Sequence, residues 1–357
     1  VLVATASVAA LVTFALARWT RPRSPESFRR WWPRIWIAAI VGVVLFALDQ
    51  RLARMEERLR ELASARTVAM QPPAASAPST PAPTGTVPAP RALWFDQAAV
   101  RTSLADTFGE VDLEAKACDG VTDFVRVHCH DPLAQAYLAI VDLQLPGLDV
   151  VLGTDLVTKS LTSTFARTER CIVAINGEAG MSPFPRSGLG RWTGHLVSKG
   201  NILLREQDDN PRPFLSLDAQ NRATFRAMSA PDRSVPPGSW NVLWGRMDAI
   251  VDGEVQLADW GNRQPRTAMG LSADGRRLFL LVVDGRQPRY SMGFTRGEVG
   301  MLLKLFGAHN AMLCDEGGSS CLYVEAMGGI VNVPSDNQGQ ERPTYTHFGI
   351  RATPKPQ

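Results

Sequence analysis

The sequence predicts an α/β domain of a mixed, α+β-like type, with a central mixed sheet that contains a βαβ unit. An N-terminal transmembrane hairpin is expected to precede this domain. Three observations support the prediction: strand, helix and strand patterns follow one another within residues 278–324, two uncharged apolar segments lie within residues 1–50, and a Pro-rich stretch separates the two regions. At 357 residues, 45% of them apolar, the chain is long enough for one large or two modest domains.

The first fifty residues have the composition of two transmembrane segments. Residues 1–17 and 35–48 are apolar and uncharged, and the loop between them carries six Arg against the single acid Glu26. The positive-inside rule places this Arg-rich loop in the cytoplasm. We therefore expect an inner-membrane protein whose C-terminal domain is periplasmic or extracellular. A cleaved signal peptide is the alternative interpretation of the first segment.

Two further segments connect the membrane region to the globular domain. Residues 51–66 predict either a short coiled coil, with weak self-association, or an amphipathic helix on the membrane surface, because apolar residues recur at spacings of three and four: Leu52, Met55, Leu59 and Leu62. Residues 67–91 contain seven Pro among small residues and predict an extended linker. The globular domain is expected over residues 92–353.

The net charge of +3 is unevenly distributed along the chain. Residues 1–66 contain 11 Arg and five acidic residues, whereas residues 92–357 contain 26 basic and 30 acidic residues. The positive excess therefore belongs to the N-terminal segment, and the globular part lacks the basic surplus typical of polyanion binding. This distribution argues against nucleic acid as the main partner.

Residues 278–324 contain the clearest structural pattern in the chain. The buried-strand pattern of residues 278–283 ends at Asp284-Gly285, and a second apolar run, residues 311–314, ends at Asp315. Between them a helix is expected, with Thr295 and Glu298 at capping-box spacing and Gly307 just beyond its end. Strand, helix and strand over this length indicate a βαβ unit.

The two strands of such a unit normally run in the same direction. Asp284 and Asp315 should then leave the same carboxyl edge of the sheet, which is where open α/β sheets bind ligands. Glycines follow both acids, and Ser319 and Ser320 add hydroxyl groups to the loop after Asp315. The alternative is that each acid only forms a tight turn, since Asp-Gly is common in turns.

Two arginines and an asparagine complete the predicted site. Arg266 directly precedes a strand pattern, and Arg286 follows Asp284 closely, so both offer forked donors suited to a phosphate or a carboxylate. Either Arg could instead pair with a neighbouring Asp. Asn176 ends another buried-strand pattern, residues 171–177. Asp252-Gly253 and Asp274-Gly275 predict hairpin turns without a chemical role.

The cysteines and histidines of residues 118–131 allow two interpretations. An exported protein favours a disulfide between Cys118 and Cys129. The alternative is a metal site formed by these cysteines together with His128, His130 and Asp131. We expect the disulfide.

Several motifs, taken in order, resemble the phosphodiester glycosidase domain family. They are CIVAING, PRTAMGLSADG, LFLLVVDGR, a T-x-x-E helix, CDEGGSS and VNVPSD, and they span roughly residues 170–351. The founding activity of this family removes N-acetylglucosamine from a phosphodiester on mannose. Where the family usually has Asn-Gly-Gly and Asp-Gly-Gly-Gly-Ser-Ser, this chain has a glutamate, Glu178 or Glu316, in place of one glycine.

The resemblance implies a glycosidase acting on a sugar 1-phosphodiester or a related envelope glycan. The residue chemistry fits independently: a phosphodiester is a good leaving group, so the site must mainly bind phosphate and stabilise an oxocarbenium-like centre. The catalytic candidates are Asp284, Asp315 and Arg266, and the candidates for substrate binding are Asn176, Arg286, Glu316, Ser319 and Ser320.

Two alternatives remain open for this site. The first is a non-catalytic glycan-binding or scaffold domain of the same fold, in which Glu178 and Glu316 have altered the pocket. The second is a divalent-cation site formed by carboxylates of Asp284, Asp315 and Glu316. No cofactor is otherwise expected, and the expected partners are a carbohydrate or glycosyl phosphate and the membrane.

Overall fold

The computed structural model describes residues 91–118, 121–178, 194–206, 211–256, 261–336 and 339–352. All of them belong to one compact unit, Val87–Gln357. The predicted transmembrane segments, the 51–66 helix and the linker up to residue 90 lie outside the described residues and stay predictions. Within the described part of the chain, the helices are too short or too polar to cross a membrane.

The largest sheet has eight strands, and its hydrogen-bonded neighbours are antiparallel throughout the described residues. In order across the sheet they are β1 (Val111–Cys118), β2 (Thr122–His130), β3 (Leu133–Asp142), β14 (Arg277–Val283), β13 (Arg266–Leu271), β15 (Asn310–Leu313), β11 (Met247–Val251) and β12 (Glu254–Val255).

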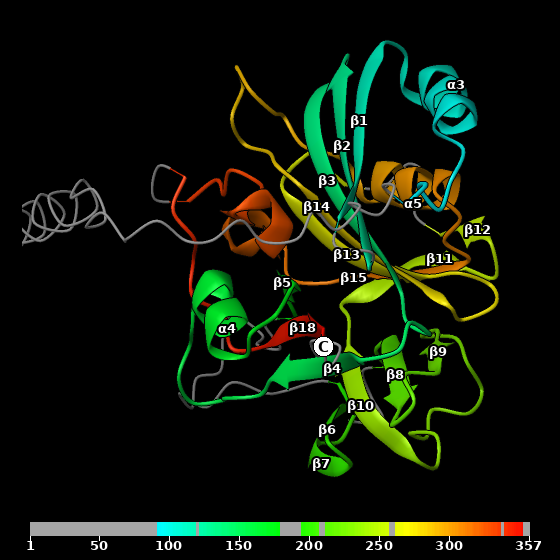
Figure 1. The fold of residues 1–357 in the computed structure, drawn as a ribbon, viewed down its shortest axis with the longest axis vertical. Coiled ribbons are helices and arrows are strands. Elements are labelled where there is room, and N and C mark those ends of the chain that lie inside the picture. Colours follow the sequence, from blue (N-terminus) through cyan, green and yellow to red (C-terminus); the bar gives the residue numbers. More distant parts are fainter. Residues whose placement is uncertain are drawn as a thin grey trace, which may run out of the picture. The chain divides into compact units, whose positions relative to one another are not determined.

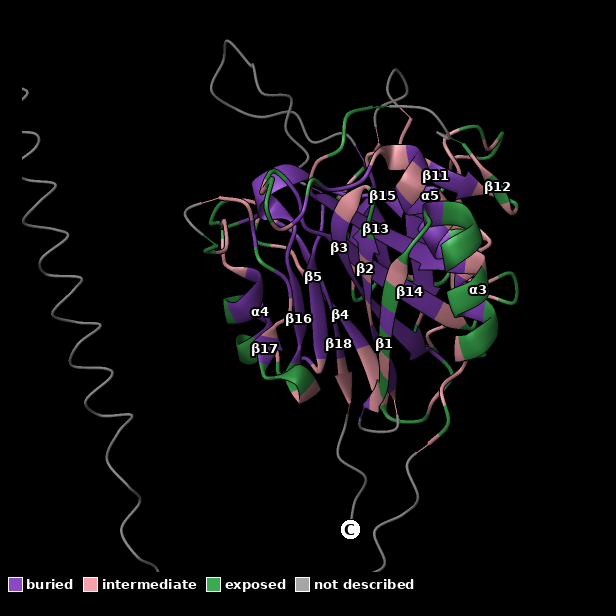
Figure 2. Ribbon diagram, turned by 90° about the horizontal axis from the view of Figure 1, so that it is seen from above, coloured by how far each residue is buried: buried purple, intermediate pink, exposed green. Residues whose placement is uncertain are grey.

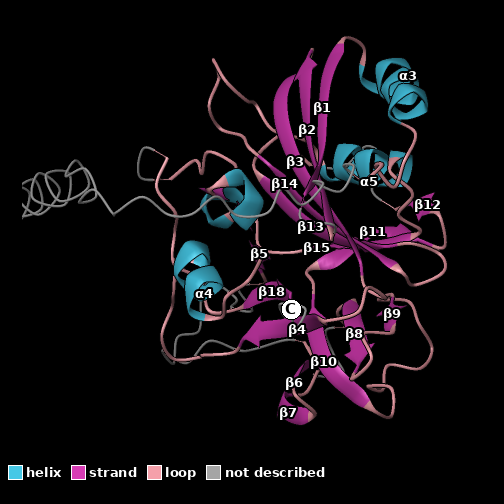
Figure 3. Cartoon of the chain, in the orientation of Figure 1, coloured by secondary structure: helices cyan, strands magenta, loops and turns pink. Residues whose placement is uncertain are grey.

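Two five-stranded antiparallel sheets and three α-helices complete the described fold (Figure 3). One sheet consists of β17 (Gly329–Ile330), β16 (Leu322–Val324), β5 (Val173–Asn176), β18 (His347–Ala352) and β4 (Leu148–Gly153). The other consists of β7 (Asn201–Leu204), β6 (Leu196–Ser198), β10 (Ser239–Trp244), β8 (Phe214–Asp218) and β9 (Ala223–Arg226). The helices are α3 (Gln97–Phe108), α4 (Thr162–Thr168) and α5 (Arg296–Leu305), with 3-10 turns η1 (Gly317–Ser319) and η2 (Glu325–Met327).

The eight-stranded sheet lies between two hydrophobic cores (Figures 1 and 2). Successive side chains of β14 alternate between them: Leu280 packs in the core shared with the five-stranded sheets, and Phe279 and Leu281 pack in the core beneath α3 and α5. Burial on both faces explains why residues 278–283 form an uninterrupted apolar run. Helix α4 covers the outer face of the sheet that contains β5.

The predicted strand-helix-strand unit is present as β14, α5 and β15, but its strands are not neighbours. Both pair antiparallel with β13, which lies between them, so they run in the same direction without touching. The expectation of a mixed sheet is therefore wrong for the described pairs, because a strand from earlier in the chain fills the gap. The expected combination of strands and helices in one domain is confirmed.

The predicted helix ends and turns agree with the structure. Helix α5 begins with a capping box between Thr295 and Glu298, and Gly307, just past its end, has φ of +99°. Asp252-Gly253 connects β11 to β12, and Asp274-Gly275 lies between β13 and β14. Positive φ angles at both glycines explain why Gly follows Asp there.

The expected disulfide between Cys118 and Cys129 is wrong. In the β1–β2 hairpin Cys118 pairs with Thr122 and Cys129 pairs with Val111, so the two cysteines lie at opposite ends. Seven residues of strand separate them by roughly 20 Å, far beyond disulfide reach. Their side chains also enter different cores, and no disulfide links any of the cysteines within the described residues.

Candidate active site

Strand register places Asp284, Arg266 and Asp315 at one edge of the eight-stranded sheet. Arg266, the first residue of β13, pairs with the last residue of β14, and the next residue is Asp284. On the other side of β13, the amide of Cys314 donates to Thr267 O at 2.9 Å, which brings the following Asp315 beside the start of β13. The predicted shared edge is confirmed, although the acids lie on either side of an intervening strand.

Asp284 is buried among uncharged hydrogen-bond donors. Its Oδ1 accepts from Asn332 Nδ2 at 2.9 Å, and its Oδ2 accepts from the Val333 amide at 2.8 Å and the Tyr290 hydroxyl at 3.1 Å. Burial raises the pKa of Asp284 to about 6, because the loss of hydration outweighs these three hydrogen bonds. The carboxylate ties the loop at residues 332–333 to the end of β14.

Asp315 lies instead among guanidinium groups. Its Oδ1 is 3.1 Å from Arg246 Nη2, and its Oδ2 is 3.7 Å from the half-exposed Arg342. The same Arg246 nitrogen lies 2.9 Å from Oε1 of Glu178, the residue two positions beyond the end of β5. One guanidinium nitrogen therefore joins carboxylates from two different sheets.

Glu178 is buried, and only one of its carboxylate oxygens has a hydrogen bond within the described residues. Oε1 is bound by Arg246, whereas Oε2 has no hydrogen-bond partner in that part of the chain. Burial raises the pKa of Glu178, despite the opposing charge of Arg246. A buried carboxyl group with a raised pKa beside a second carboxylate is a common feature of acid-base sites.

Glu316 is the centre of a buried ion-pair network. Arg296 binds it with two hydrogen bonds of 3.0 Å, Arg266 Nη1 lies 2.7 Å away, and Arg246 lies 3.9 Å away. Burial opposes ionisation of Glu316, but the hydrogen bonds from Arg296 and the positive charges of Arg266 and Arg296 outweigh it and lower its pKa. Arg266, only 1% exposed, also donates to Phe294 O at 2.9 Å. The pair of Arg266 and Glu316 is therefore almost completely shielded from solvent.

Asn176, Ser319 and Ser320 support the loop after β15. Asn176 donates to the Asp315 carbonyl at 3.0 Å and accepts from Thr267 Oγ1 and the Cys321 amide, each at 3.0 Å. Ser319 donates to Glu316 O at 3.1 Å. Ser320 Oγ is buried and has no hydrogen-bond partner within the described residues.

Arg286 is the most accessible of the predicted site residues. Its Nη2 donates to Gln264 Oε1 at 2.9 Å, and within the described ranges no carboxylate lies at salt-bridge distance. Its guanidinium packs over Gly317, where a Cβ atom would lie 2.9 Å from Arg286 Nη1. Gly317 also has φ of +77°, so the backbone conformation favours glycine there, whereas the exposed Arg286 side chain could move away from a Cβ atom.

Three arginines of this site were not predicted from the sequence: Arg246, Arg296 and Arg342. Arg246 follows the apolar run of β10 by two residues, which is the same kind of signal that indicated Asp284. Arg296 is the first residue of α5, directly after the N-cap Thr295, where the sequence pattern indicates only a helix start. Arg342 lies in a loop with no recognisable pattern.

The structure does not gather Asp284, Asp315 and Glu316 as metal ligands. Within the described ranges, the one cluster of three His, Cys, Asp or Glu side chains with donor atoms close enough for one ion contains none of them. Asp315 and Glu316 are instead neutralised by guanidinium groups. A cation at this edge would therefore have to compete with those arginines.

Comparisons with known proteins agree with the motif order. The family model for phosphodiester glycosidase matches residues 169–351. A search of curated protein sequences found no match. Among solved structures, a hypothetical protein from Synechocystis aligns with a TM-score of 0.53 at 13% identity, over 68% of this chain and 64% of that one.

A second similar structure comes from zebrafish. It is the catalytic domain of N-acetylglucosamine-1-phosphodiester alpha-N-acetylglucosaminidase, autoinhibited by its pro-peptide, with a TM-score of 0.50 and 18% identity over 68% of this chain and 83% of that chain. Identities this low show a shared fold. Because the family model matches just over half of the sequence, the chain belongs to the phosphodiester glycosidase family.

Proposed function

We propose that this chain hydrolyses a sugar 1-phosphodiester by breaking the bond between the anomeric carbon and the phosphate oxygen. Glu178 and Asp315 serve as the pair of reacting carboxyl groups. Arg286 and Arg342, whose guanidinium groups reach solvent, bind the phosphate. The family match supports the reaction class, and the arrangement of charges supports the assignment of residues.

The observation that carries this proposal is the position of Arg246. Its Nη2 lies 2.9 Å from Glu178 Oε1 and 3.1 Å from Asp315 Oδ1, so these two oxygens are at most about 6 Å apart. Glycosidases that retain anomeric configuration hold their carboxyl groups about 5–5.5 Å apart, whereas inverting enzymes need about 6.5–9.5 Å. The shorter range favours a retaining, two-step mechanism.

In the first step an Asp315 oxygen bonds to the anomeric carbon, and the phosphate monoester leaves with the bonding electron pair. A phosphate monoester needs little protonation to leave, so Arg286 and Arg342 only have to neutralise its charge. In the second step water attacks the same carbon, Glu178 takes a proton from that water, and the bond to Asp315 breaks. The raised pKa of Glu178 suits a base that works near neutral pH.

Other residues of the site position this pair in our proposal. Arg266 and Arg296 hold Glu316, and Glu316 fixes the start of the loop that carries Asp315. Asn176 ties that loop to β5 through the Asp315 carbonyl. A buried network of this kind would keep the reacting groups in place without reorganisation.

The cellular setting is a second part of the proposal. The Arg-rich loop between residues 18 and 34 supports two spans in the inner membrane, with the catalytic domain outside and an envelope glycan as substrate. A reporter enzyme that works only outside the cytoplasm should be active when it is fused after residue 90. A reporter active only in the cytoplasm would contradict this topology.

The activity test uses the 4-nitrophenyl ester of N-acetylglucosamine 1-phosphate and the purified full-length chain. Cleavage at the sugar gives nitrophenyl phosphate, which becomes coloured only after phosphatase is added; attack at phosphorus would expel nitrophenolate, the better of its two leaving groups, and give colour directly. We expect phosphatase-dependent colour, insensitive to chelator, and an initial sugar product of unchanged anomeric configuration by NMR. Colour without phosphatase would contradict a glycosidase, and saturable binding without turnover would favour the scaffold alternative.

A further inference from the structure

Outside the family-matched region, Asp112, His128 and His130 converge on the β1–β2 hairpin. We propose that these three side chains bind a divalent transition-metal ion of the zinc class, which links edge strand β1 to β2. Two imidazoles and one carboxylate are a typical ligand set for such ions. This proposal is independent of the proposed hydrolysis.

Strand register brings the three side chains together. His128 and His130 are two residues apart on β2, so their side chains leave the same face of the sheet, and Asp112 pairs directly with His128. The residues between them, Val127 and Cys129, point into the core under α3 and α5. The three polar side chains therefore project away from this core.

The distances fit ligands that share one ion. Asp112 Oδ2 lies 2.9 Å from His130 Nε2 and 3.4 Å from His128 Nδ1, and donor atoms of all three residues lie within 4.8 Å of one another. Ligands of a tetrahedral zinc ion, with bonds of about 2.0–2.1 Å, lie roughly 3.3 Å apart. Small side-chain movements would suffice to admit the ion.

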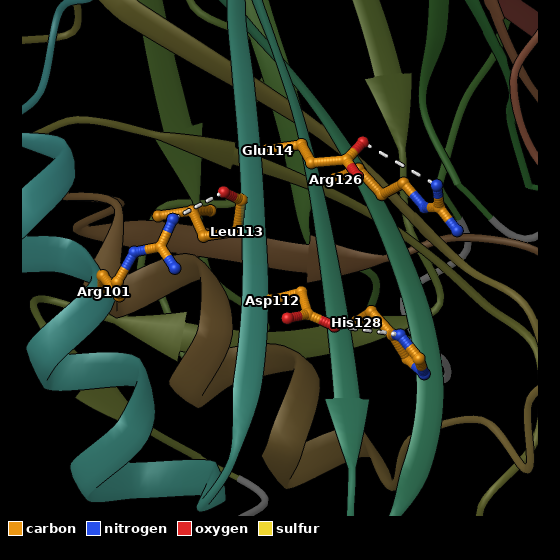
Figure 4. Close-up of a pocket in the computed structure, with 6 residues that line it drawn as sticks. All are labelled: Arg101, Asp112, Leu113, Glu114, Arg126 and His128. Carbon is orange, nitrogen blue, oxygen red and sulfur yellow. Dashed lines mark hydrogen bonds and ion pairs between the residues drawn. The ribbon is translucent and has the colours of Figure 1, made fainter.

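The cluster is open to solvent, and the two arginines beside it, Arg101 and Arg126, have partners of their own; Arg101 donates to Leu113 O at 2.9 Å. Asp112 and His128 line a shallow pocket of about 240 Å³ together with Glu114 and Arg126 (Figure 4). Arg126, the neighbouring cation on β2, is already engaged by Gln135 at 3.1 Å and by Glu114 at 3.7 Å. An ion could enter from this side and keep one position for water.

Simple Asp–His hydrogen bonds would bring the same residues together, so binding must be measured. His309 provides a matched control, because its side chain is 39% exposed, as is that of His130, and it also faces a single aspartate, Asp252. Within the described residues, His309 belongs to no cluster of three potential metal ligands. Removing His309 should therefore leave metal binding intact.

The experiment titrates Zn²⁺ into the untagged full-length chain by calorimetry after chelator treatment. We expect one ion per chain, a dissociation constant raised at least about 100-fold in H130N and D112N, and no change in H309N. Zn²⁺ should raise the melting temperature of the wild type and H309N but not of H130N, and Co²⁺ should give the visible spectrum of a tetrahedral site. Absence of one-to-one binding by the wild type, or equally tight binding by H130N and D112N, would overturn the proposal.

Discussion

Asp284 and Asp315 leave the same edge of one sheet, yet their surroundings are opposite in kind. Asp284 is enclosed by the amide of Val333, the side chain of Asn332 and a tyrosine hydroxyl, all uncharged. Asp315 faces two guanidinium groups and a second carboxyl group across Arg246. Sheet topology fixes where both acids lie, whereas loops from other parts of the chain decide what each can do.

This difference assigns separate roles in our account. The buried carboxyl group of Asp284 can hold a loop through its neutral donors. Within the described residues, no salt bridge or carboxyl partner accompanies it. Asp315 combines a partner carboxyl group with cations that can bind phosphate. We therefore expect substitutions of Asp315 to affect turnover and substitutions of Asp284 to affect stability.

The largest expected effect is that of Asp315→Asn on turnover. The change keeps the size of the side chain but removes the nucleophile, so kcat/KM should fall by at least about 1,000-fold. Steady-state assays with the nitrophenyl substrate, together with denaturant unfolding, would measure both consequences. A variant with full activity would show that Asp315 does not react with substrate.

Glu178→Gln should separate the two chemical steps. Without a base the second step slows, so we expect kcat to fall about 100-fold, with a burst of nitrophenyl phosphate of one equivalent per chain. The wild-type kcat should fall as the pH drops below the raised pKa of Glu178. This acidic fall in the pH profile of kcat should be absent in the variant. If the variant kept the acidic fall in kcat, a group other than Glu178 would be responsible for it.

The ion pair of Arg266 tests the supporting network. Arg266→Met leaves Glu316 with fewer cations in a buried site and should lower the free energy of unfolding by about 3 kcal/mol. Arg263→Met removes a more exposed pair with Glu298 and should cost less than about 1 kcal/mol. Denaturant unfolding of both variants gives the comparison, and equal losses would contradict a special role for the buried pair.

A further prediction concerns the pH dependence of stability at Asp284. Because its folded pKa, about 6, lies above the usual value of 3.8, its favourable contribution is complete below about pH 4 and is lost as the pH rises through about 6. The stability of the wild type relative to Asp284→Asn should therefore fall by up to about 3 kcal/mol across this range. A difference that is constant with pH would show that Asp284 has an ordinary pKa.

Much of the sheet edge could be predicted from local patterns. The apolar runs before Asp284 and Asp315 and the capped helix between them fix two strands with a common direction, whatever strand lies between them. The position of β13 between β14 and β15 could not be foreseen. The sequence pattern of a strand shows that it is a strand, but not which other strands it pairs with. The same limitation explains the incorrect Cys118–Cys129 disulfide, since strand register decides which ends of a hairpin meet.

The ionic part of the site was harder to predict from the sequence. Arg246 and Glu178 each follow a strand, but nothing in the sequence shows that strands from different sheets end at one place. The sequence marks Glu178 only as a departure from the family pattern, whereas Glu316 is also a candidate for substrate binding. In the structure each has an arginine partner, which gives a physical reason for a charge where the family has glycine.

The most direct test of this account compares Asp315→Asn with Asp284→Asn in one assay. We would measure kcat/KM for both variants at pH 7, each corrected for its folded fraction determined by unfolding under the same conditions. Our account predicts that the value for Asp315→Asn is at least about 100-fold below that for Asp284→Asn. Equal values, or a lower value for Asp284→Asn, would contradict the separate roles of the two acids.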